Sequence, residues 1–183
     1  MSTWTGVLAA SLLAVALPTS EAQAESAYPN FLAGLGVGGS YGEYSGGTLD
    51  LELDFGRHGQ YFALSLEAGA GTTSQKYGTF DQKVAIGTLA LGWRGIFLHG
   101  PLRPTTYLGA FWGYERNFST KEEFLPAGAR LLVGASYFFD QRFSLGAEVG
   151  GTLGSHIILG AGMYGAPYSE LVETFEARLR FTF

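Results

Sequence analysis

The side chains best suited to catalysis lie close together near the C-terminal end of the sequence. Ser155 and His156 are neighbours, and Glu170 follows them after a short interval. A serine activated by a histidine that a carboxylate orients is the arrangement of many hydrolases. Successive residues of a strand point to opposite faces, so Ser155 and His156 meet only where the chain bends. We therefore predict no catalytic residue, and retain Ser155, His156 and Glu170 as the candidates if the protein is an enzyme.

Groups that bind metals, cofactors or nucleic acids are sparse. The chain has no cysteine, and its histidines, His58, His99 and His156, are far apart without a carboxylate cluster at ligand spacing. Residues 34–39 formally fit the GxGxxG dinucleotide pattern, but that pattern needs a helix after the glycines, and an alternating segment follows here. The formal net charge of -5 offers no basic excess for a phosphate backbone. We predict no metal, no cofactor and no nucleic-acid partner.

A third group of charged residues lies on the polar faces of alternating segments. Glu148 lies about five residues after the start of the seventh alternating segment, and Arg178 lies about five residues before the end of the eighth. On adjacent antiparallel strands this spacing would place the two side chains at similar heights. We predict that they pair within a larger network, because isolated charges are very costly in a low dielectric. The network would either plug the interior or act as a gate for ions. It comprises Glu52, Glu67, Arg130, Glu148, Glu176, Arg178 and Arg180.

The elements that must position these residues are strands. Apolar and polar residues alternate in stretches of about ten residues separated by turn chemistry, and no amphipathic helical period persists. In GTLDLELDF (residues 47–55), four apolar side chains share one face and three acidic ones share the other. Eight strands are predicted, at residues 31–41, 48–56, 60–70, 83–97, 105–115, 128–139, 143–153 and 171–183.

The fourth segment is the least regular. Val84 and Ile86 have one parity, whereas Leu89, Leu91 and Trp93 have the other. A β-bulge near residues 87–88 would return both sets to one face, and we predict one there. The connections after the second, fourth and sixth segments are short, and those after the third, fifth and seventh are long and polar. This alternation of short turns and long loops is typical of a transmembrane barrel.

The composition of the two faces indicates which solvent each one meets. Charged residues make up only 15% of the chain, below the roughly 25% of soluble domains. The polar faces are small residues with a few opposite charges, which suits a narrow lumen, and the apolar faces suit lipid. A soluble barrel with its apolar face inward is the alternative. Aromatic residues near the strand ends would form two interfacial girdles, with Phe55, Tyr61, Trp93, Phe97, Phe139 and Phe143 at the short turns and Tyr41, Trp112 and Tyr114 at the long loops.

The N-terminal segment has the features of a secretory signal. An apolar run over residues 7–17, too short to span the roughly 30 Å of a bilayer core, precedes Pro18 and the small-residue pattern of Ala22 and Ala24. No lysine or arginine precedes that run, which departs from the usual pattern. We predict a signal peptide over residues 1–24 and a barrel domain over residues 25–183.

The predicted mature chain resembles a known group over essentially its whole length. The eight alternating segments and a last segment that ends in Arg180-Phe181-Thr182-Phe183 are similar to the small OmpA-like and OmpX-like barrels of the outer membrane of Gram-negative bacteria. The resemblance implies an eight-stranded antiparallel up-and-down transmembrane β-barrel in the outer membrane. It also implies that the barrel-assembly machinery recognises the alternating apolar residues Phe175, Ala177, Leu179, Phe181 and Phe183 of the last segment. We also predict that the protein is exported and is a monomer.

The resemblance identifies an architecture and a membrane, so the role is open among three classes. The first is a structural or surface-interaction protein that contacts outer-membrane lipid, lipopolysaccharide or other surfaces through loops at residues 71–82, 116–126 and 154–170. The second is an OmpW-like protein that binds or transports small hydrophobic molecules. The third is an enzyme that modifies lipid A. We expect the first, with no enzymatic activity.

Overall fold

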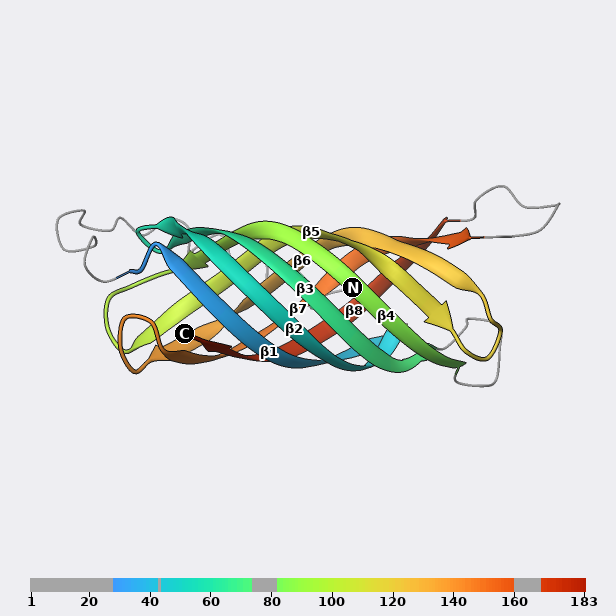
Figure 1. Ribbon diagram of the computed structural model, residues 1–183, viewed down its shortest axis with the longest axis horizontal. Coiled ribbons are helices and arrows are strands. Elements are labelled where there is room, and N and C mark those ends of the chain that lie inside the picture. Colours follow the sequence, from blue (N-terminus) through green and yellow to red (C-terminus); the bar gives the residue numbers. More distant parts are fainter. Residues whose placement is uncertain (1–27, 43, 74–81, 160–168) are drawn as a thin grey trace, which may run out of the picture.

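The computed structural model describes residues 28–42, 44–73, 82–159 and 169–183. These form a closed barrel in which each strand pairs with its sequence neighbours and β8 pairs with β1 (Figure 1). The strands are β1 (Phe31–Gly42), β2 (Tyr44–Arg57), β3 (Gln60–Thr73), β4 (Gln82–Ile96), β5 (Leu102–Asn117), β6 (Glu123–Phe138), β7 (Ser144–Leu159) and β8 (Ser169–Thr182). The predicted all-β, eight-stranded antiparallel architecture is confirmed. In the described ranges no helix is long and apolar enough to cross a membrane. The predicted signal peptide, residues 1–24, lies outside them.

The two faces of the barrel wall have the polarity opposite to that of a water-soluble barrel. On β2, Leu49 and Leu51 are 64% and 56% exposed on the outside, whereas Glu52 and Asp54 are 4% and 0% exposed inside. The same alternation continues around the wall, where exposed leucine, valine and phenylalanine cover the exterior. A soluble barrel with an apolar interior is therefore the wrong alternative for this chain.

The two ends of the barrel differ. One end, which we call the turn end, carries the connections at residues 58–59, 97–101 and 139–143, together with the C-terminal Phe183. At the β2–β3 connection His58 and Gly59 both have positive φ (54° and 77°), which suits the tight hairpin turns that match strand twist. At the β6–β7 connection the backbone amides of Arg142 and Phe143 each donate to Asp140 Oδ1 at 2.7 Å. These bonds hold the pKa of Asp140 below its usual value.

The opposite end, the loop end, has longer strands than predicted. β5 runs to Asn117, β6 begins at Glu123, and β7 runs to Leu159, so the connections are shorter than the predicted loops at residues 116–126 and 154–170. The polar composition of residues 116–126 does not end β5 and β6, because water can solvate polar side chains on a ladder whose backbone bonds stay intact. Polar composition therefore indicates where the apolar band stops, and the strands continue beyond it.

The predicted bulge in β4 is absent. Residue pairing with β3 and with β5 runs without interruption through Gly87 and Thr88. Val84 consequently faces the interior and is buried, while Leu89 and Leu91 lie on the outward face. The prediction was wrong because it required every apolar side chain to face outward, and the barrel interior accepts apolar groups near the loop end.

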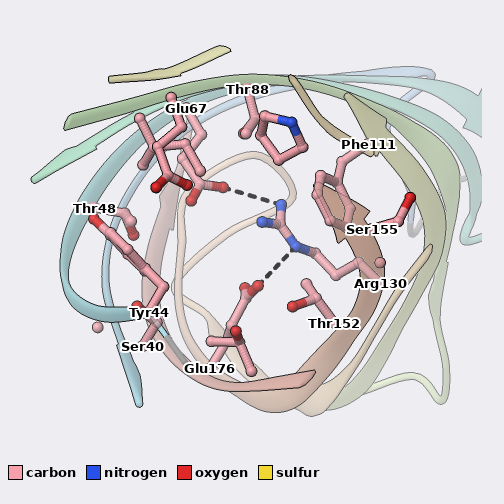
Figure 2. Close-up of a pocket in the computed structure, with 16 residues that line it drawn as sticks. Ser40, Tyr44, Thr48, Glu67, Thr88, Phe111, Arg130, Thr152, Ser155 and Glu176 are labelled. Carbon is pink, nitrogen blue, oxygen red and sulfur yellow. Dashed lines mark hydrogen bonds and ion pairs between the residues drawn. The ribbon is translucent and has the colours of Figure 1, made fainter. Parts of the chain in front are cut away.

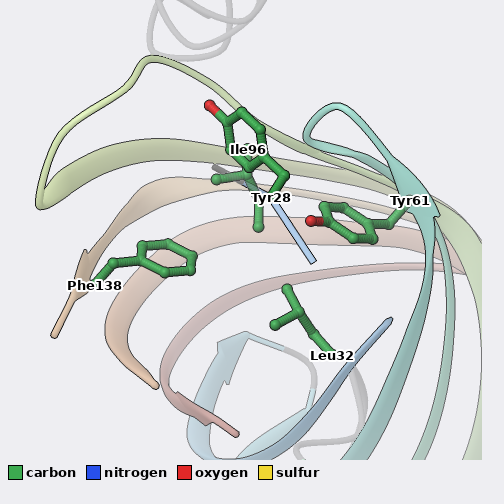
Figure 3. Packing of buried hydrophobic residues seen from close by; sticks show 5 residues of the cluster. All are labelled: Tyr28, Leu32, Tyr61, Ile96 and Phe138. Carbon is green, nitrogen blue, oxygen red and sulfur yellow. The ribbon is translucent and has the colours of Figure 1, made fainter. Parts of the chain in front are cut away.

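Aromatic side chains gather near both rims of the exterior, with one exception. Phe55, Phe139 and Phe143 are exposed at the turn end, and Tyr41 and Trp112 are exposed toward the loop end. The exception is Tyr61, which was assigned to the girdle. It faces the interior and is 1% exposed, in an apolar cluster near the turn end that comprises Tyr28, Leu32, Tyr61, Ile96 and Phe138 (Figure 3).

Glycine makes room for charged side chains at one close approach in the lumen. A Cβ atom on Gly36 of β1 would overlap the carboxylate of Asp50, which is held by Arg178. We expect Gly36→Ala to lower the free energy of unfolding by about 1–3 kcal/mol, because Asp50 must leave that ion pair. The outward-facing Gly39 has its nearest atom, Gly46 O, at 3.6 Å, so Gly39→Ala is the matched control, with an expected change within about 0.5 kcal/mol. Urea titration of the folded barrel in detergent micelles measures both, and equal effects would contradict the close approach.

Candidate functional site: the charged lumen

Two clusters of buried ion pairs occupy the lumen. The first, here called the lower cluster, lies nearer the turn end and joins Arg94 and Arg180 to three carboxylates. Arg94 pairs with Glu52 and Glu148, and its Nε lies 3.4 Å from Asp54 Oδ2. Arg180 pairs with both Glu52 and Asp54. All five side chains are at most 4% exposed, so these carboxylates rely on the two guanidinium groups for their charge compensation.

The second, upper cluster lies nearer the loop end. Arg130 bridges Glu67 at 3.0 Å and Glu176 at 3.2 Å, and Figure 2 shows its guanidinium reaching between these two carboxylates. Arg178 contacts the same two carboxylates at 2.6 Å and 2.8 Å, and contacts Asp50 at 3.1 Å. Glu67 and Glu176 are each shared by two arginines. The upper cluster therefore connects strands β2, β3, β6 and β8 across the interior.

A small apolar group lies beside these clusters. Tyr107 packs with Ala63 and Leu132, and the guanidinium carbon of Arg94 lies 5.4 Å from the centroid of the Tyr107 ring. Arg130 lies at the same distance from the ring of Phe111. Planar guanidinium groups gain from such ring faces when they are removed from water. These rings thus help to hold the arginines in the conformations that the ion pairs require.

The charge balance of the network is negative. Among the described residues, the ion pairs join four arginines to six carboxylates, which gives two more acids than bases. Removing charges from water costs several kcal/mol each, and paired geometry recovers that cost only where the partners are well placed. Each arginine contacts two or three carboxylates, and this sharing compensates the two excess negative charges.

The structure places the seven charged residues singled out in the sequence inside the barrel, in these two clusters. Glu148 and Arg178 are register partners on β7 and β8, as their spacing suggests. The pair predicted between them is not formed, since Glu148 pairs with Arg94 and Arg178 pairs with the upper-cluster acids. Long guanidinium side chains reach across the lumen to other strands, so adjacency on the wall does not decide the partner.

Sequence reasoning left three members out of the network. Asp50 and Asp54 alternate with Glu52 on the same face of β2, so the alternation that found Glu52 also indicated them. Arg94 lies between the outward-facing Trp93 and Gly95, and strict alternation along β4 assigns it to the interior. The signal for all three was present in the parity of their strands.

The candidate catalytic residues lie on strands rather than in a loop. Ser155 and His156 belong to β7, where Ser155 pairs with Leu171 of β8 and His156 pairs with Glu170. Their order along one strand gives them opposite parity, as expected from the sequence. Ser155 borders the lumen cavity, and the side chains of His156 and Glu170 fall outside the described part of the structure.

The cavity above the upper cluster is small. It measures about 60 Å³, enough for a few water molecules, and its lining includes Tyr44, Glu67, Phe111, Arg130 and Glu176 (Figure 2). Across the described ranges, no three His, Cys, Asp or Glu side chains are arranged to hold a metal ion. Chemically, the site can hold water and fixed charges, and it has too little space for a drug-sized or lipid-sized ligand.

Comparison with known proteins gives a fold. No family model and no curated protein matches the sequence. Among solved structures, Neisserial surface protein A has a TM-score of 0.56 and 13% identity over 84% of this chain and 96% of its own. A major outer membrane protein of Thermus thermophilus (TM-score 0.45, 14% identity, 84% and 99% covered) and the attachment invasion locus protein Ail of Yersinia pestis (0.37, 8%, 84% and 96%) also match. The likeness to Neisserial surface protein A bears out the predicted resemblance at the level of fold: this chain has the fold of a small eight-stranded outer-membrane β-barrel.

Proposed function

We propose that this protein is an integral outer-membrane β-barrel of a Gram-negative bacterium, with a lumen plugged by ion pairs and loops that interact with other surfaces. One observation carries the proposal: large apolar side chains cover the exterior while the ten charged residues of the ion-pair network are buried inside. An apolar exterior is costly in water and favourable in acyl chains. Closing the sheet also pairs the backbone groups that a bilayer core would leave unsatisfied.

The dimensions of the wall support a membrane position. The strands have 12 to 16 residues, which at about 3.3 Å per residue and a tilt near 45° reach or exceed the ~25 Å apolar band of such barrels. The exposed aromatic residues at both rims lie where headgroups would meet acyl chains. Phe175, Leu179 and Phe181 are exposed in the outward row of β8, and Phe183, directly after the strand, is exposed as well. We propose that this row is the signal for the barrel-assembly machinery.

The partners that we propose are outer-membrane lipid and lipopolysaccharide, with the barrel as a monomer. Lys83 and Arg116 are exposed on the outward parity of β4 and β5, beyond Trp112 toward the loop end. Arg116 pairs with Ala85 in the strand register, and the Phe118 amide donates to Lys83 O at 2.9 Å, so the two cations lie on neighbouring stretches of backbone. Cations just above an aromatic belt suit the phosphate groups of a lipid headgroup.

The competing roles are tested by different measurements. The small lumen cavity favours a plug over an OmpW-like passage for hydrophobic molecules, and an uptake assay with such molecules would detect a passage along another route. An enzyme acting on lipid A through Ser155, His156 and Glu170 would change the lipid A mass spectrum of cells that contain the protein. We expect neither the uptake nor the spectrum to change on deletion.

The proposal predicts the orientation of the barrel in the membrane, with the loop end outside the cell and the turn end in the periplasm. The chain has no cysteine, so a single engineered one is a unique label. Lys121 in the β5–β6 connection and Arg142 in the β6–β7 connection are both exposed and lie at opposite ends. We expect a membrane-impermeant maleimide to label Lys121→Cys on intact cells, and to label Arg142→Cys only after the outer membrane is permeabilised.

The two variants are matched controls for each other, since each replaces an exposed cation in a short connection. Labelling of Arg142→Cys alone on intact cells would mean that the barrel is inverted. Recovery of the protein in the soluble fraction without detergent would contradict the membrane assignment altogether.

A further inference from the structure

The residues just before β1 fold into the turn end of the barrel. Tyr28 is 7% exposed and packs in the apolar cluster with Leu32, Tyr61, Ile96 and Phe138, and Figure 3 shows its ring beside Ile96 inside the wall. We propose that residues 28–30 together with Arg103, here called the latch, close this end of the lumen. This closure is additional to the ion-pair plug and made by different chemistry.

Each residue of the segment is tied to a different part of the wall. The Tyr28 hydroxyl donates to the Leu98 carbonyl, in the β4–β5 connection, at 2.5 Å. The Tyr61 hydroxyl donates to the Pro29 carbonyl at 2.9 Å, and the Gly56 amide donates to Asn30 O at 2.9 Å. These three hydrogen bonds fix residues 28–30 to β2, to β3 and to the β4–β5 connection.

Arg103 completes the closure from the other side. Its guanidinium carbon lies 4.9 Å from the centroid of the Tyr28 ring and 4.2 Å from that of Phe138, so the cation lies between two aromatic faces. Its Nε donates to Gly100 O at 2.8 Å. Arg103 is only 7% exposed, although it is the second residue of β5 and lies close to the turn end. Aromatic rings and one cation thus cover the lumen at this end.

The latch and Tyr61, which bonds to it, lie nearer the turn end than the ion-pair clusters. On β5, Arg103 precedes Thr105, whose hydroxyl donates to Glu148 of the lower cluster at 3.1 Å. On β3, Tyr61 precedes Glu67 of the upper cluster by six positions. A solute entering from the turn end therefore meets the latch before it meets the ion-pair clusters.

A buried reporter thiol tests the latch directly. Ser136 of β6 is the register partner of Arg103, is 1% exposed, and has a buried hydroxyl without a hydrogen-bond partner among the described residues. Ser136→Cys changes little volume and introduces the only thiol of the chain. The measurement is the rate at which a small charged methanethiosulfonate reagent modifies this thiol in folded protein in detergent micelles, where both ends are accessible.

We expect slow modification with the native latch, and an increase of about tenfold or more when Tyr28→Ala is added, because local opening then needs less free energy. Tyr28→Phe keeps the ring and loses only the bond to Leu98 O, so its rate should lie between the two. Phe31→Ala is the matched control: its ring is exposed on the outside and packs on Phe55, so the rate should stay unchanged.

Equal rates in the native and Tyr28→Ala backgrounds would overturn the latch. Folding of each variant is verified by near-UV circular dichroism before labelling, and Tyr28→Phe keeps the test valid if the alanine variant does not fold. The modification rate depends on neither a membrane nor the loops, so this experiment tests the latch independently of the proposed surface role.

Discussion

Replacing Arg94 with alanine should lower the free energy of unfolding by about 3–5 kcal/mol, the largest effect expected in the lumen. Arg94 is 2% exposed and contacts the carboxylates of Glu52, Asp54 and Glu148. Glu52 and Asp54 keep Arg180 as a partner, whereas Glu148 is left with the Thr105 hydroxyl among the described residues. The cost is therefore mainly that of a buried carboxylate that has lost its cation.

A double-mutant cycle separates this cause from a loss of packing. Adding Glu148→Gln to Arg94→Ala removes the uncompensated charge and should restore part of the lost stability, although Glu148→Gln alone should destabilise the native protein. Arg57→Ala, which replaces the exposed last residue of β2, is the control, with a change within about 0.5 kcal/mol. Urea titrations in micelles, followed by tryptophan fluorescence, give the free energy of unfolding of the native protein, the two single variants, the double variant and the control. Additive effects of the two lumen substitutions would show that Arg94 and Glu148 do not depend on each other.

Replacing Leu51 with arginine should cost about 2–4 kcal/mol for a barrel folded in lipid vesicles, because the charge would face acyl chains near the middle of the wall. Leu51 is 56% exposed on the outward face of β2. In a water-soluble barrel the same substitution at an exposed position would be neutral. The prediction therefore measures the solvent of the outer face as well as the orientation of β2.

The matched control is an arginine at the rim of the same face. Phe55 is outward on β2, near the turn end, and Phe55→Arg should lose only about 0–1 kcal/mol from the charge because the side chain can reach the headgroups. An unchanged stability for Leu51→Arg, in a protein that refolds fully in vesicles, would mean that the apolar face of β2 does not contact lipid.

Much of the fold follows from local pattern. Leu49, Leu51 and Asp50 alternate on β2 because successive strand residues face opposite sides, and this alone assigns leucine to one face and acid to the other. Counting such stretches predicted the eight strands, and the sparse charges predicted which face is inside. The prediction for Tyr61 is wrong, because an aromatic residue near a strand end suits both the exterior girdle and an apolar cluster in the interior.

Local pattern cannot say which residues meet across the interior. Glu148 lies beside Arg178 on the wall and pairs with Arg94 of β4, because closure and strand tilt bring β4 and β7 to face each other and an arginine side chain spans the gap. The latch at Tyr28 and Arg103 depends on the same closure, since its partners are separated by 75 positions in sequence. The alternation of apolar and polar residues thus determines the number of strands and which side chains face inward. The charge partners and the closed turn end are decided only when the sheet closes, because closure sets the distances between side chains on different strands.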